Sequence, residues 1–144
     1  MQYITGIHAL NLPCNLNTTG DWHTSGIQWE KPYTQDSSDS IFGEWGIEAG
    51  HKIPDHQGTY FVANHIRACL DMLAAGDFSD LKGMRDDYIC HDEYTPLIFG
   101  KVLSLRDSSM WDAINRFMER EYRMQWIHFF RRAQNEAGSL ATGS

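Results

Sequence analysis

The sequence is short of several features that mark whole classes of protein. It has only three cysteines, Cys14, Cys69 and Cys90, which are widely spaced and form no C-x-x-C pair. A disulfide scaffold has more cysteines in a shorter chain, so we expect free thiols in a reducing compartment. No apolar run reaches the roughly 18 residues that a membrane span requires. Residues 1–12 also lack the basic start and long apolar stretch of a secretory signal, and we therefore expect a cytoplasmic protein that does not bind membranes.

Positive charge is also scarce. Twelve Lys and Arg residues stand against nineteen Asp and Glu residues, which gives a net charge of −7. Binding to nucleic acid or to an anionic membrane needs a positive surface, so the composition argues against both. The charge is unevenly spread, because residues 1–58 hold two basic and seven acidic residues, whereas residues 116–132 hold five arginines and two glutamates.

The hydrophobic period changes near Gly58. Before it, residues 3–12 and 27–29 have strand-like composition, and apolar side chains in residues 41–48 fall at every second position, as on a strand with one buried face. After it, apolar residues recur every three or four positions, which predicts helices. The expected helices are residues 62–75 with a stop at Gly76, residues 78–89, a third beginning at Thr95-Pro96, and a long one of about 25 residues from Trp111.

These patterns predict an α+β domain over residues 1–137. An antiparallel, β-rich portion, residues 1–58, packs against a bundle of about four helices in residues 59–137, and residues 138–144 form a flexible tail. The alternative is two half-domains divided near residue 58. It is disfavoured because a sheet built from about 50 residues needs the helices to cover its apolar face.

The densest group of reactive and aromatic side chains lies in residues 20–29. Asp21 and His23 are candidates for a catalytic carboxylate–imidazole pair, with Cys14 or Ser25 as a nucleophile. No nucleophile elbow or family-specific cysteine signature surrounds Cys14. The alternative is a turn that starts a strand, in which Asp21 caps the turn and His23 is half exposed.

Metal binding has weaker support in the sequence, although seven histidines are present. His51 and His56 lie five positions apart beside Asp55, and residues 90–93 read Cys-His-Asp-Glu. Neither group has zinc-ligand spacing, and adjacent residues rarely coordinate one ion tetrahedrally. We therefore expect no metal and no other cofactor.

Arginine and tryptophan side chains supply candidate binding residues. Arg116, Arg120 and Arg123 have the spacing of one helical face, which suits contact with an anion or an acidic partner. A solvated face with helix-internal ion pairs explains the same pattern. The indole rings of Trp22, Trp29 and Trp45 are candidate walls of a binding pocket, with burial in the core as the alternative.

Two stretches of the sequence, TGIHALNLPCNLNTTGDWHTSGIQW and ANHIRACLDMLAAGDFSDLKGMRDDYICHDEYTPLIFGKV, resemble a small bacterial protein family for which no activity is established. The resemblance covers residues 3 to about 126 and implies no catalytic residue. Members of that family tend to lie among defence or toxin–antitoxin genes. The resemblance therefore implies an accessory or partner-binding role in a bacterial cytoplasm.

Two functions follow as hypotheses. The first is a non-enzymatic protein that binds a protein partner or a second copy of itself, as the neutralising or accessory member of a defence or toxin–antitoxin module. Its acidic N-terminal half suits a basic partner. The second is a small enzyme that acts on a nucleotide or another phosphorylated substrate, with the Asp21–His23 pair for chemistry and an arginine of residues 116–123 as the anion contact.

Overall fold

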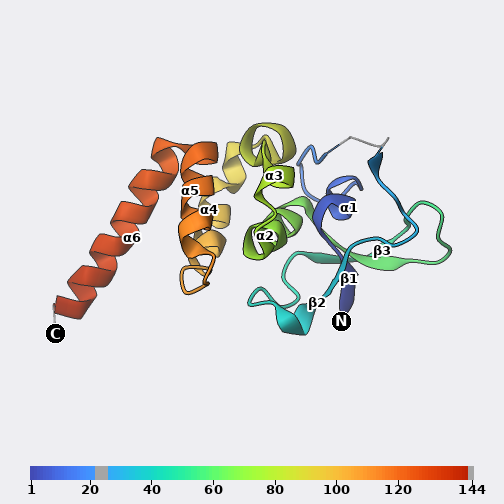
Figure 1. Cartoon of the computed structure of the whole chain (residues 1–144), viewed down its shortest axis with the longest axis horizontal. Coiled ribbons are helices and arrows are strands. Elements are labelled where there is room, and N and C mark those ends of the chain that lie inside the picture. Colours follow the sequence, from blue (N-terminus) through green and yellow to red (C-terminus); the bar gives the residue numbers. More distant parts are fainter. Residues whose placement is uncertain (22–25, 143–144) are drawn as a thin grey trace.

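The computed structural model describes residues 1–21 and 26–142, the last five of them as backbone alone (Figure 1). One end of the elongated molecule is a four-stranded sheet of order β2-β1-β4-β3. The strands are β1 (Gln2–Ile4), β2 (Thr34–Asp36), β3 (Ile47–His51) and β4 (Tyr60–Ala63). Strand β1 pairs antiparallel with β2 but parallel with β4. The sheet is therefore mixed, whereas the sequence predicted an antiparallel one.

Most of the remaining described residues are helical, so the fold is α+β as predicted. Helices α1 and α2 lie against the sheet, α4 and α5 are in the middle, and α6 projects at the end opposite the sheet (Figure 1). The α-helices are α1 (Gly6–Leu10), α2 (His65–Ala75), α3 (Phe78–Leu81), α4 (Thr95–Leu103), α5 (Trp111–Tyr122) and α6 (Met124–Thr142). Shorter turns of helix are η2 (Ser37–Asp39), η3 (Met84–Ile89, π-helical) and η4 (Asp92–Tyr94).

Helix α2 is the centre of the core. All of its residues from His65 to Leu73 are buried, and the predicted stripe of Ile66, Leu70 and Leu73 is completely so. The Asn64 side chain accepts a hydrogen bond from the Arg67 backbone N–H at the start of the helix, and Gly76 ends it in a left-handed conformation. Buried apolar residues continue from Tyr3 in β1 to Trp126 in α6, so the sheet and the helices share one core.

The structure does not change from strands to helices at Gly58 as predicted, because a helix precedes this residue and a strand follows it. Helix α1 occupies the middle of the stretch predicted as a strand over residues 3–12, and strand β4 lies after Gly58. Residues 41–46 form turns, because Gly43 and Gly46 adopt positive φ angles of 55° and 76°. Phe42 is consequently buried and Ile41 is 66% exposed, which reverses the burial that alternation predicted.

The long helix predicted from Trp111 is broken into α5 and α6. Arg123 separates them with a φ angle of +56° and a ψ angle of −129°, which end α5 and change the direction of the chain. The apolar stripe continues across the break, because Tyr122 of α5 and Trp126 of α6 both pack on Phe99 of α4. Helix α6 then continues to Thr142, into the segment where a flexible tail was expected. The predicted helix over residues 78–89 is likewise interrupted, at Gly83.

Candidate functional site

The predicted Asp21–His23 pair lies partly outside the described residues, which include Asp21 but not His23. Asp21 is buried, and its backbone N–H donates to the Leu10 carbonyl oxygen over 2.8 Å. The Asn11 amide lies 3.4 Å from its carboxylate. Trp22, His23 and Ser25 lie outside the described residues. These contacts place Asp21 beside the C-terminal end of α1.

Trp29 and Trp45 pack separately. The ring of Trp29 lies edge-on to the imidazole of His8, with 5.1 Å between ring centroids. The ring of Trp45 faces the Lys101 ammonium at 4.5 Å, which is a cation–π contact between the loop before β3 and α4. Both rings are half-buried. Both tryptophan rings therefore connect separate structural elements.

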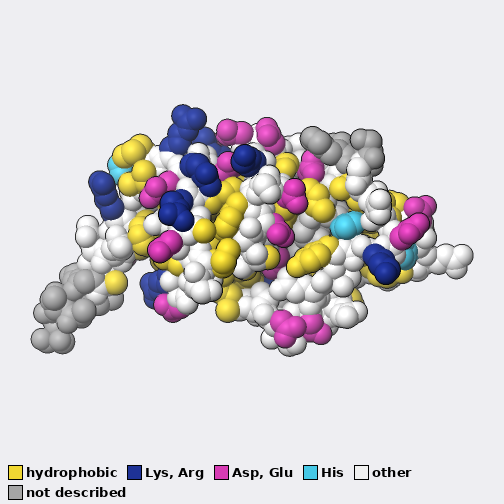
Figure 2. Space-filling model, in the orientation of Figure 1, with side chains coloured by type: hydrophobic (Ala, Val, Ile, Leu, Met, Phe, Trp, Pro, Cys, Tyr) yellow, Lys and Arg dark blue, Asp and Glu magenta, His cyan; other side chains and the backbone are white. Residues whose placement is uncertain are grey.

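The three predicted arginines divide between a helix and its end. Arg116 and Arg120 are exposed on α5, one turn apart, whereas Arg123 lies beyond the last residue of α5. On the face of the molecule shown in Figure 2, most Lys and Arg side chains lie over the helical end, away from the sheet. The three arginines thus belong to a more basic region of the surface at the helical end of the molecule.

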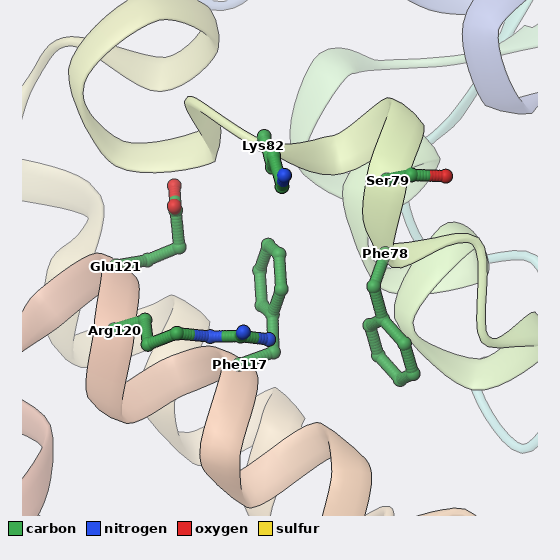
Figure 3. A pocket seen from close by; sticks show the side chains of 6 residues that line it. All are labelled: Phe78, Ser79, Lys82, Phe117, Arg120 and Glu121. Atoms are coloured by element: carbon green, nitrogen blue, oxygen red, sulfur yellow. The ribbon is translucent and has the colours of Figure 1, made fainter.

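A cavity of about 480 Å³ lies between α3 and α5 (Figure 3). Phe78 and Phe117 give it an aromatic wall, with their ring centroids 5.6 Å apart. The charged side chains at its rim are Lys82, Arg120 and Glu121. Burial raises the pKa of the Glu121 carboxyl, although backbone N–H groups of residues 83–85 donate to it and act in the opposite direction. Arg120 is the predicted binding residue that this cavity includes.

Two further cavities flank α6 where it packs on α4. One of about 350 Å³ is lined by Phe99 and Phe129, with Arg132 among its polar residues. The other, of about 370 Å³, is lined by Leu103 and Phe130, with Arg106 and with Ala133 and Ala137 of α6. Each of the three cavities therefore combines at least one phenylalanine with one arginine. Sequence reasoning missed this pattern, because most of the lining residues come from four separate helices, α3, α4, α5 and α6.

A second cluster lies beside the N-terminus of α2, where the loop after α1 contacts that helix. The Cys14 sulfur lies 3.4 Å from the Thr18 hydroxyl, and that hydroxyl lies 2.7 Å from Nδ1 of His65. Nε2 of His65 lies 2.6 Å from the Leu12 carbonyl oxygen. The sequence suggested Cys14 as a nucleophile but did not connect it with His65, since 51 positions separate them.

Cys14 and His65 each shift the pKa of the other. Burial acts to raise the pKa of the Cys14 thiol, but hydrogen bonding to His65 and Thr18 outweighs burial and lowers it. Burial acts to lower the pKa of the His65 imidazole, whereas the contacts with Cys14 and the Leu12 carbonyl outweigh it and raise it. The arrangement favours charge separation between thiol and imidazole.

Among residues 1–21 and 26–142, no group of three or more His, Cys, Asp or Glu side chains is placed to hold a metal ion. In the same residues, no helix is both long enough and apolar enough to span a membrane. Comparison with models of known protein families, with curated protein sequences and with solved structures finds no match for this chain.

Proposed function

We propose that the chain is a partner-binding protein, and that an acidic segment of a protein partner docks on the surface formed by α3, α4, α5 and α6. The observation that supports this proposal is the repeated combination of phenylalanine and arginine at the three cavities described above. Aromatic residues and arginine are the types enriched at protein interfaces, where they anchor into pockets.

Charge selects the class of partner. The chain carries a net charge of −7, yet residues 116–132 hold five arginines and two glutamates. Arg106, Arg120 and Arg132 each line a cavity. An acidic segment with apolar side chains satisfies both parts of this surface, because its carboxylates pair with guanidinium groups and its apolar side chains fill the aromatic hollows. The acidic N-terminal half, which first suggested a basic partner, contributes none of these three cavities' lining residues.

The projection of α6 makes this surface accessible. The first half of α6 is anchored by Trp126, which is fully buried and donates from its indole N–H to Asn115 of α5 over 2.7 Å. The residues that follow, 131–137, are mostly exposed. The resemblance to a family found among defence and toxin–antitoxin genes favours a partner encoded in such a module.

The direct test is selection of short random peptides displayed against the purified protein. We expect the enriched peptides to combine Asp and Glu with Trp, Phe or Leu. The affinity of these peptides for the protein is measured by fluorescence anisotropy. It should be roughly tenfold lower for the Arg132→Glu variant, a loss of about 1.4 kcal/mol in binding free energy. The neighbouring exposed Arg131 lines none of these cavities, so Arg131→Glu is the matched control. Enrichment without acidic residues, or equal losses in both variants, would show that the proposed surface is wrong.

The cavity between α3 and α5 also supports a second candidate, the binding of a nucleotide or another small phosphorylated ligand. Lys82 and Arg120 carry positive charge to its rim, and the half-buried Phe78 offers an aromatic ring for stacking (Figure 3). Titration with adenosine monophosphate, followed by the shifts of backbone amide NMR signals, tests it. Shifts around Phe117 that disappear in Arg120→Gln but persist in Arg116→Gln support this candidate. Absence of saturable shifts excludes it for this ligand, while leaving the peptide test unaffected.

A further inference from the structure

The Cys14–Thr18–His65 cluster has a defined direction of proton donation. Because the Leu12 carbonyl oxygen can only accept, Nε2 of the neutral His65 ring carries the hydrogen and Nδ1 is the acceptor. The Thr18 hydroxyl therefore donates to Nδ1 over 2.7 Å, and its oxygen is free in this arrangement to accept from the Cys14 thiol at 3.4 Å. The path leads from the thiol to a base held in the required tautomer.

The loop that carries Cys14 is fixed in place from several sides. The Asn15 backbone N–H donates to the Glu48 carboxylate over 2.9 Å, and the Asn17 N–H donates to the Tyr94 hydroxyl over 3.1 Å. At the end of the loop, Gly20 donates from its N–H to the Tyr88 carbonyl oxygen and packs against the His65 ring. The thiol is thus positioned by the fold before any ligand arrives.

We propose that Cys14 is a nucleophilic thiol that accepts an acyl group from a small, uncharged acyl donor, with Thr18 and His65 receiving the thiol proton. The Cys14 sulfur attacks the carbonyl carbon of the donor, a carbon–sulfur bond forms, and the bond from that carbon to the leaving oxygen breaks. The thiol proton passes through the Thr18 hydroxyl to Nδ1 of His65 and from there to the leaving group. The products are a thioester on Cys14 and the released alcohol.

The surroundings of Cys14 select against anionic donors. The Glu48 carboxylate, which accepts from Asn15 and lies 2.7 Å from Nε2 of His51, places negative charge beside the loop. It also acts to raise the pKa of His65, and so favours the imidazole as proton acceptor. Cys14 is half-buried, which leaves access for a small electrophile.

The other two cysteines are internal references. Cys69 is fully buried, and burial raises the pKa of its thiol far above the ordinary value. Cys90 is exposed, and its thiol donates to the backbone carbonyl oxygens of Asp86 and Asp87. If exposure alone determined reactivity, Cys90 would react faster than Cys14. The proposal predicts the reverse.

The test uses 4-nitrophenyl acetate with the full chain, measuring nitrophenolate release and the acetylated residue by mass spectrometry of the acid-quenched protein. We expect Cys14 to be acetylated at least about tenfold faster than Cys90 at neutral pH, because positioned proton transfer contributes at least that much. The rate at Cys14 should also reach half its maximum at a pH below the ordinary pKa of a cysteine thiol. Cys14→Ser should leave only the slow Cys90 reaction.

Matched substitutions at Thr18 separate chemistry from structure. Thr18→Val keeps the size of the side chain but removes the hydroxyl, so it should slow Cys14 to the rate of Cys90 and raise the pH midpoint. Thr18→Ser keeps the hydroxyl and should preserve the fast reaction. His65→Gln should act as Thr18→Val does, with circular dichroism and the unchanged rate at Cys90 as controls for folding. Reaction at Cys14 no faster than at Cys90, or a rate and pH midpoint unchanged in Thr18→Val, would overturn the proposal.

Discussion

Arg67 and Asp71 form a fully buried ion pair one turn apart on α2, with 2.9 Å between Nε and Oδ1. The hydroxyl groups of Tyr3 and Thr5 also donate to the Asp71 carboxylate, over 2.6 and 2.7 Å. Arg67 donates in turn to the Gly43 carbonyl oxygen over 2.8 Å. One charged pair thereby joins β1, the turn before β3 and the central helix. It explains how a sheet of very short strands is held in place against α2.

Removing the charge of Asp71 should be strongly destabilising. In Asp71→Asn, the Arg67 guanidinium stays buried without its counter-charge, and we expect the free energy of unfolding to fall by about 3–5 kcal/mol. The double variant Arg67→Met/Asp71→Leu leaves no buried charge and should cost less than Asp71→Asn alone. Urea unfolding followed by circular dichroism measures both. A loss below about 1 kcal/mol in Asp71→Asn would contradict burial of the pair.

Glu121 should make stability depend on pH. Burial raises the pKa of its carboxyl in the folded state, so the folded protein holds the proton more tightly than the unfolded chain does. The stability that this group contributes is present below the unfolded-state pKa and is lost as the pH rises through the folded-state pKa. We therefore expect Glu121→Gln to raise the melting temperature at neutral pH and to change it little near pH 4, which is close to the ordinary pKa of glutamate. Glu119→Gln, an exposed change on the same helix, is the control and should show no such difference. An equal effect of Glu121→Gln at both pH values would contradict the assignment.

The helices were more predictable from the sequence than the sheet. The start of α4 at Thr95-Pro96 and the stop of α2 at Gly76 are confirmed, because proline at a helix start and glycine at a helix end act through local backbone geometry. The strands have three to five residues each, and their partners lie far apart in the sequence. The alternation of apolar residues over 41–48 therefore predicted the wrong burial, because backbone turns at Gly43 and Gly46 determine which side chains are buried.

The candidate sites were less predictable still. Cys14, Thr18 and His65 meet only because the loop after α1 folds onto the start of α2, and no local pattern encodes that contact. The predicted face of Arg116, Arg120 and Arg123 depended on an unbroken helix, which the backbone at Arg123 does not permit. Arg120 nevertheless lines a cavity, together with Phe117, which lies three positions before it on α5.

Arg123 should be a site where glycine is stabilising. Its φ angle of +56° with a ψ angle of −129° is strained for any residue with a Cβ atom, at a cost of about 1–3 kcal/mol. Glycine removes this strain but loses more conformational entropy on folding, about 0.5–1 kcal/mol. We expect Arg123→Gly to raise the free energy of unfolding by about 1 kcal/mol, whereas Arg123→Ala, which removes the same charge, should not. Destabilisation by Arg123→Gly would show that the junction of α5 and α6 has a different conformation.

Substituting alanine at Gly20 and at Gly50 distinguishes the cost of backbone strain from the cost of steric contact. Their φ angles are nearly equal, +77° and +78°, so alanine meets the same unfavourable left-handed conformation at both, about 1–2 kcal/mol. At Gly50 an added Cβ meets nothing within 4 Å, but at Gly20 it would lie 2.5 Å from the Leu10 carbonyl oxygen and 2.7 Å from Cε1 of His65. We therefore expect Gly50→Ala to cost about 1–2 kcal/mol and Gly20→Ala to cost several times as much, or to prevent folding, in urea unfolding experiments. Because the Leu10 oxygen belongs to the backbone, neither neighbour of Gly20 can move aside without displacing α1 or the His65 ring. Equal losses in the two variants would mean that the loop of Cys14 does not pack on His65 as closely as the structure shows.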